Sequence, residues 1–76
     1  MEKFIISLKP DKEKDATGLE YDFMNQFKDM QAACDFARMM LLSHQGIYRE
    51  AVVKKRWKSD LSFRQCCDAI EYNYNL

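Results

Sequence analysis

A basic segment at residues 52–59, VVKKRWKS, is the stretch whose residue types and spacing could do chemistry. It holds four of the twelve Lys and Arg residues of the chain. At the period of two residues typical of a strand, Lys54, Arg56 and Lys58 fall on one face, and Tyr48 precedes them on that face. Cationic side chains hold phosphate groups, and aromatic rings stack on bases. The segment therefore indicates a surface for nucleic acid or for an acidic protein partner.

The same stripe is also typical of an exposed sheet surface, which is the interpretation we favour. Trp57 shares its face with Val53, so it belongs with the core side chains rather than with the cations. Glu20 and Asp22 lie on the open face of a neighbouring hairpin, where opposite charges pair across adjacent strands. The chain carries twelve basic and twelve acidic residues, whereas nucleic-acid-binding domains usually carry a basic excess. Nucleic-acid binding is therefore the alternative hypothesis.

Three cysteines and one histidine are the potential metal ligands. Cys34, His44, Cys66 and Cys67 have the donor atoms that zinc prefers, but adjacent cysteines replace the usual C-x2-C spacing. Cys34 and one of the adjacent pair also fall on apolar helical stripes, where a thiol packs as a small hydrophobic group. We therefore expect core cysteines and no metal. The odd count argues against the disulfide framework of a secreted domain.

No pattern in the sequence points to catalysis. Glu20 and Asp22 share a strand face, and Asp68 and Glu71 share a helix face, but all four are expected to be exposed. Paired acids do acid–base chemistry when their environments differ. The chain has only two glycines, so it lacks a glycine-rich loop for a nucleotide phosphate. The sequence therefore predicts no catalytic residue and no cofactor.

Hydrophobic periodicity predicts five elements in the order β-β-α-β-α. They are strands at 4–8, 19–27 and 47–58 and helices at 30–43 and about 62–72. Asp29 is the expected N-cap of the first helix. Ser62 and Gln65 fit a capping box at the start of the second.

These elements predict an α+β fold, a small two-layer sandwich in which a three-stranded sheet carries both helices on one face. Residues 1–76 are expected to form a single compact domain, with a mobile charged loop at about 9–18. The side chains expected in the core share the apolar stripes of the elements. They are Phe4, Ile6, Leu8, Leu19, Tyr21, Phe23, Met30, Ala37, Leu41, Val53, Trp57, Phe63 and Ile70.

The end of the chain carries a second periodicity. Phe63, Cys66 and Ile70 follow helical spacing, whereas Ile70, Tyr72 and Tyr74 alternate with polar residues, which is typical of a strand. We favour the helix and keep the strand as the alternative.

A surplus of apolar side chains points to a partner. Phe36, Met39 and Leu42 lie off the central apolar stripe of the first helix, and Tyr72 and Tyr74 add aromatic surface near the C-terminus. In the simplest interpretation, the second helix covers Phe36 and Met39, and the rest is ordinary exposed apolar surface. The other interpretation is an interface, because Tyr, Met and Phe are enriched in interface cores.

The sequence therefore predicts a small non-enzymatic intracellular protein that acts as a protein–protein interaction or regulatory module, alone or as a homodimer. The predicted partner-binding residues are Phe36, Met39, Leu42, Tyr72 and Tyr74. The alternative is a nucleic-acid-binding module that uses Tyr48, Lys54, Arg56 and Lys58. The chain shows no signal-peptide pattern, and its longest apolar run is too short to span a bilayer. We therefore expect a cytoplasmic protein with no membrane partner.

Overall fold

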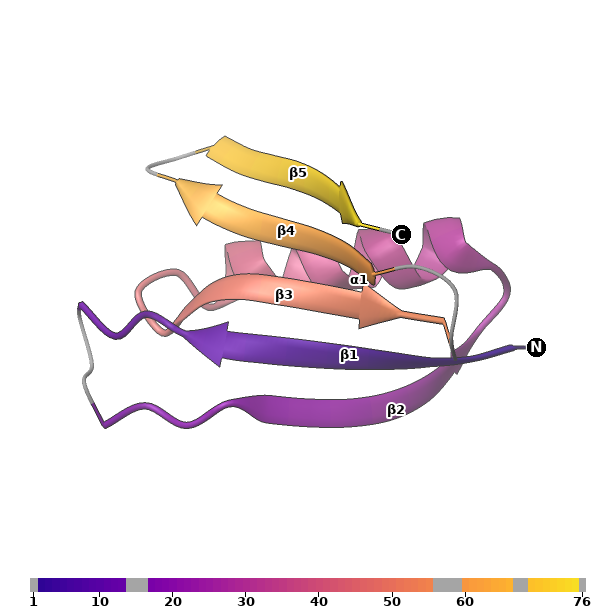
Figure 1. Ribbon diagram of the computed structural model, residues 1–76, viewed down its shortest axis with the longest axis horizontal. Coiled ribbons are helices and arrows are strands. Elements are labelled where there is room, and N and C mark those ends of the chain that lie inside the picture. Colours follow the sequence, from indigo (N-terminus) through magenta and orange to yellow (C-terminus); the bar gives the residue numbers. More distant parts are fainter. Residues whose placement is uncertain (1, 14–16, 56–59, 67–68, 76) are drawn as a thin grey trace.

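The computed structural model describes residues 2–13, 17–55, 60–66 and 69–75, within which lie five strands and one helix (Figure 1). In chain order the elements are β1 (Glu2–Pro10), β2 (Tyr21–Phe27), α1 (Met30–Ser43), β3 (Tyr48–Lys54), β4 (Asp60–Cys66) and β5 (Ala69–Asn75). The charged loop expected from residue 9 begins later, because Lys9 and Pro10 still pair with β3.

The five strands form one sheet in the order β2-β1-β3-β4-β5, and each neighbouring pair is antiparallel. Both β2 and β3 are antiparallel to β1, which lies between them, so β2 and β3 run parallel to each other. The helix α1 connects them across one face of the sheet (Figure 1). We call this side the helix face and the opposite side the open face. The two edge strands are β2 and β5.

Local sequence sets both ends of α1. At its start, the Asp29 carboxylate accepts a hydrogen bond from the backbone N–H of Ala32 at 2.9 Å, as an N-cap does. At its end, the His44 backbone N–H donates to the Met40 carbonyl at 3.1 Å. Gly46 follows with a φ of 87°, a backbone conformation that favours glycine. The predicted N-cap and the predicted bounds of this helix are confirmed.

The core lies between α1 and the helix face of the central strands. Its buried residues are Phe4, Ile6, Leu8, Ala33, Cys34, Ala37, Leu41, Ala51, Val53, Leu61 and Phe63. Ala33 and Ala37 are fully buried, and their short side chains allow a close approach of helix and sheet. Ile6 lies opposite Val53, and Val53 lies opposite Leu61. The strand register therefore forms a continuous apolar layer across β1, β3 and β4.

The predicted three-stranded sheet with two helices is wrong. The segment expected to form the second helix forms β4 and β5 instead, and α1 is the single helix among the described residues. A period of two places both Leu61 and Phe63 in the core. Ser62, expected to cap a helix, donates its hydroxyl to the Glu50 carboxylate on β3. The strand periodicity that we kept as the alternative is the correct one for β5.

Most of the predicted core is confirmed. The buried members are Phe4, Ile6, Leu8, Ala37, Leu41, Val53 and Phe63. The partly buried members are Phe23, Met30 and Ile70. The core prediction is wrong for Leu19 and Tyr21, which have 83% and 55% of their surface exposed. Leu19 precedes β2, and α1 packs mainly over β3 and β4 and so leaves Tyr21 uncovered. Trp57 lies outside the described residues.

Two neighbouring leucines of α1 test this packing. Leu41 is fully buried and Leu42 is half-exposed. Leu41→Ala should lower the free energy of unfolding by about 2–5 kcal/mol, because it leaves a cavity beneath the helix. Leu42→Ala should change it by no more than about 0.5 kcal/mol, as substitutions on the surface do. Urea unfolding followed by circular dichroism measures both, and equal losses would contradict this orientation of α1.

Candidate functional site

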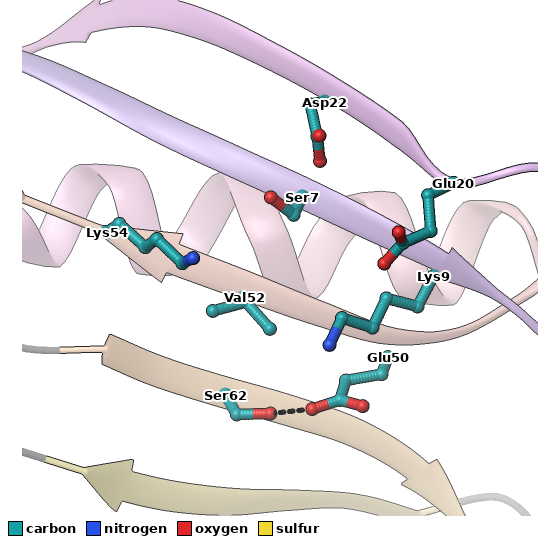
Figure 2. A pocket seen from close by; sticks show the side chains of 8 residues that line it. All are labelled: Ser7, Lys9, Glu20, Asp22, Glu50, Val52, Lys54 and Ser62. Carbon is teal, nitrogen blue, oxygen red and sulfur yellow. Dashed lines mark hydrogen bonds between the residues drawn. The ribbon is translucent and has the colours of Figure 1, made fainter.

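A polar hollow of about 320 Å³ lies on the open face (Figure 2). Its lining residues are Ser7, Lys9, Glu20, Asp22, Glu50, Val52, Lys54 and Ser62. Ser7 lies opposite Val52, and Val52 lies opposite Ser62. These three side chains are short and form the floor, while longer charged side chains surround them (Figure 2).

Side chains of alternating charge cross the open face beside this floor. Lys9 lies opposite Glu50, which in turn lies opposite Arg64. The Glu50 carboxylate accepts a hydrogen bond from the Ser62 hydroxyl and lies 3.6 Å from Arg64 Nε. Opposite charges on neighbouring strands stabilise a sheet by about 0.2–1 kcal/mol a pair. Glu50 therefore has a structural explanation, which is to hold β3 and β4 in register.

Lys54 faces this hollow together with Glu20 and Asp22. Direct pairing of Lys54 with these carboxylates across adjacent strands was expected, but β1 lies between β2 and β3. Among the carboxylates whose side chains the structure describes, none lies within ion-pair distance of Lys54; the side chain of Asp60, opposite Lys54 on β4, is not among them. The nearby acidic side chains lower the local positive potential, which disfavours the binding of phosphates. The other two cations of the predicted stripe, Arg56 and Lys58, lie outside the described residues.

Tyr48, expected beside Lys54, lies on the other face of the sheet. Its ring centroid is 5.7 Å from that of His44, at the end of α1, and it packs partly buried against the core. The cause is a register irregularity between β1 and β3 at Lys9 and Pro10, since a bulge re-aims the side chains beyond it. The structure therefore does not join this aromatic ring to the basic stripe.

A second surface lies where β5 extends beyond α1. The Arg38 guanidinium is 5.1 Å from the ring centroid of Phe63 and 5.9 Å from that of Tyr72. The two rings are themselves 5.3 Å apart. Leu42 follows Arg38 by one helical turn on the same side of α1. We use the name β5 surface for Arg38, Leu42, Ile70, Tyr72 and the outer edge of β5.

The β5 surface contains two of the five predicted partner-binding residues. Leu42 and Tyr72 are half-exposed there. Phe36 lies on the opposite side of α1, with ring centroids 5.8 Å from Phe23 and 5.4 Å from Phe27. It is thus covered by the rings of β2, and not by the second helix that we expected.

Of the remaining two predicted residues, the structure describes the side chain of one. Met39 is exposed on the outer side of α1. The side chain of Tyr74 lies outside the described part of the structure. The sequence analysis did not predict a role for Arg38, the cation that lies over the rings of this surface. The signal that could have found the surface is the alternation of Ile70, Tyr72 and Tyr74, which predicts a strand.

The backbone of β5 is the other component of this surface. An edge strand has unpaired N–H and C=O groups along one side, and natural proteins often block such an edge with Lys, Pro or a bulge. The seven residues of β5, AIEYNYN, include none of these residue types, and β5 pairs with β4 without a register shift. The edge is therefore chemically able to accept another strand.

Two of the three cysteines are described, and Cys67 lies outside the described residues. Cys34 is buried and Cys66 is exposed, and both are free. Burial raises the pKa of the Cys34 thiol, an effect that the nearby Arg38 opposes. Within the described ranges, no three His, Cys, Asp or Glu side chains gather as a metal site would require. His44 places Nδ1 2.9 Å from the Met40 carbonyl at the end of α1.

Comparison of the chain with models of known protein families, with characterised proteins and with solved structures found no match. Among the described residues, no helix is both long enough and apolar enough to cross a membrane.

The contrast between the two described thiols can be measured. At neutral pH, iodoacetamide should modify Cys66 quickly and Cys34 slowly, because only the thiolate reacts and burial both shields Cys34 and raises its pKa. Peptide mass spectrometry gives each rate, and unfolding in urea is the control that should equalise them. Fast labelling of Cys34 in the folded protein would contradict its place in the core.

Proposed function

We propose that this chain is a small non-enzymatic protein-binding module and that the β5 surface is its binding site. The observation that carries the proposal is that α1 stops short of β5. This leaves Tyr72 52% exposed beside an open strand edge. An aromatic ring next to unpaired backbone groups offers both apolar area and directional hydrogen bonds to one partner.

The side chains of the β5 surface are those that interfaces favour. Tyr and Arg are enriched among the residues that carry most of the binding energy, and Leu42 adds apolar area beside them. Arg38 lies over two rings and 3.8 Å from Asp35. These contacts restrict its side chain before a partner arrives, so less conformational entropy is lost on binding.

The partner chemistry that fits this site is an extended strand. A peptide added to a sheet edge gains main-chain hydrogen bonds, and alternate side chains give specificity. On the helix face, such a strand would lie against Tyr72 and Leu42. The proposed location is the cytoplasm, where reducing conditions keep thiols such as Cys34 and Cys66 free.

Nucleic-acid binding draws less support from the described residues. Lys54 lies among carboxylates in the polar hollow, and Tyr48 is not beside it. Binding to phosphates, which weakens as the salt concentration rises, would have to rest on Arg56 and Lys58.

Site-specific photo-crosslinking tests the proposed function. A benzophenone amino acid at position 72 should give a covalent adduct with a protein partner in the native host, whereas the same group at position 24, exposed on β2, should not. Leu42→Glu should abolish the adduct formed at position 72, because it places a charge in the apolar part of the site.

The matched control is Met39→Glu, on the outer side of α1, which should leave the adduct intact. The proposal fails if position 72 gives no adduct. It also fails if positions 72 and 24 give the same adducts, or if Leu42→Glu leaves the adduct at position 72 unchanged.

A further inference from the structure

We propose that the strand bound by the β5 edge is β5 of a second copy of this chain, paired antiparallel across a two-fold axis. This inference rests on the proposed function and names its partner. Two five-stranded sheets would then join into one continuous sheet, with both helices on the same side. Each chain would use its β5 edge once, so the assembly closes as a dimer.

One register pairs β5 along its full length. It places Ala69 opposite Asn75, Ile70 opposite Tyr74, Glu71 opposite Asn73 and Tyr72 opposite its own copy. In an edge strand, every second residue directs its backbone N–H and C=O away from the sheet. This register pairs odd-numbered residues with odd and even with even, so the outward-directed groups of the two copies face each other.

Charge favours the same register. Glu71 is the only charged residue of β5. With Tyr72 at the centre, each Glu71 carboxylate lies opposite Asn73 of the second copy, whose amide can donate hydrogen bonds to it. A register centred on Glu71 would instead set two carboxylates directly opposite each other, which is destabilising. The chain has zero formal net charge, so two copies approach without net repulsion.

Each edge strand keeps an exposed tyrosine, Tyr21 on β2 and Tyr72 on β5, and the two edges differ in what α1 places beside them. On β2, the rings of Phe23 and Phe27 already pack against Phe36 of α1. On β5, Tyr72 lies beside Phe63 and the Arg38 guanidinium and stays half-exposed. In the dimer, the two Tyr72 rings lie opposite each other across the new strand pair, where aromatic pairs are stabilising.

Charge variants at Asn73 test this register. Asn73 is exposed, so its substitution should leave the monomer folded. Asn73→Lys places a cation opposite Glu71 of the second copy, and Asn73→Asp places an anion there, at two symmetric positions. At low salt, the dimer dissociation constant should fall for Asn73→Lys and rise for Asn73→Asp, each by about 2- to 30-fold. High salt should shrink both changes.

Gln26 on β2 is the matched control. In a full-length β2–β2 pairing, Gln26 would lie opposite Asp22, so Gln26→Lys and Gln26→Asp would respond in the same way. If β5 is the interface, they should leave the dissociation constant unchanged. Sedimentation velocity from micromolar to millimolar protein measures all five chains, and circular dichroism checks that each is folded.

A chain that stays monomeric throughout this range overturns the second-copy proposal, as does a dimer that responds to Gln26 variants and not to Asn73 variants. If the monomer still gives a Leu42-dependent adduct with a different protein at position 72, the proposed function stands. If that adduct is also missing, both proposals fail.

Discussion

One helix cannot cover this sheet, and the rest of the structure depends on that constraint. An α-helix is about 10 Å wide with its side chains, and strands lie about 4.8 Å apart. A single helix therefore shields two or three strands, whereas this sheet has five. The fully buried residues Val53 and Phe63 lie on the strands beneath α1, and exposure rises outward to Tyr21 on β2 and Tyr72 on β5.

The two uncovered margins differ in chemistry. Towards β2, α1 extends Phe36, whose ring packs on Phe23 and Phe27 and completes a small apolar cluster. Towards β5, α1 extends Arg38, whose guanidinium lies over the rings of Phe63 and Tyr72. Phe63 is fully buried, whereas Tyr72 stays half-exposed. On β2, the exposed Tyr21 lies beside this closed cluster, whereas on β5 the exposed Tyr72 lies beside a guanidinium and unpaired backbone groups. The combination on β5 underlies the proposed binding site.

Sequence periodicity predicted the first two-thirds of the fold because one period dominated each segment there. The N-cap Asp29 and the wide apolar stripe that follows it allow only a helix. The segment after residue 60 was mispredicted, because Phe63 and Ile70 fit helical and strand spacing alike, and Ser62 with Gln65 imitates a capping box. Strand order and the bulge beside Lys9 and Pro10 arise from tertiary packing. Periodicity placed Lys54 on the same face as Glu20 and Asp22, as the structure does. It could not predict the face of Tyr48, the strand that separates Lys54 from those carboxylates, or the β5 surface.

Amide hydrogen exchange, followed by NMR at increasing protein concentration, tests the central claim most directly. The claim is that β5, and not β2, is the edge that receives another strand. The outward-directed amides of β5 should exchange more slowly as the concentration rises, while those of β2 keep a constant rate. Unchanged exchange in β5 at every concentration, or slowing confined to β2, would contradict the claim.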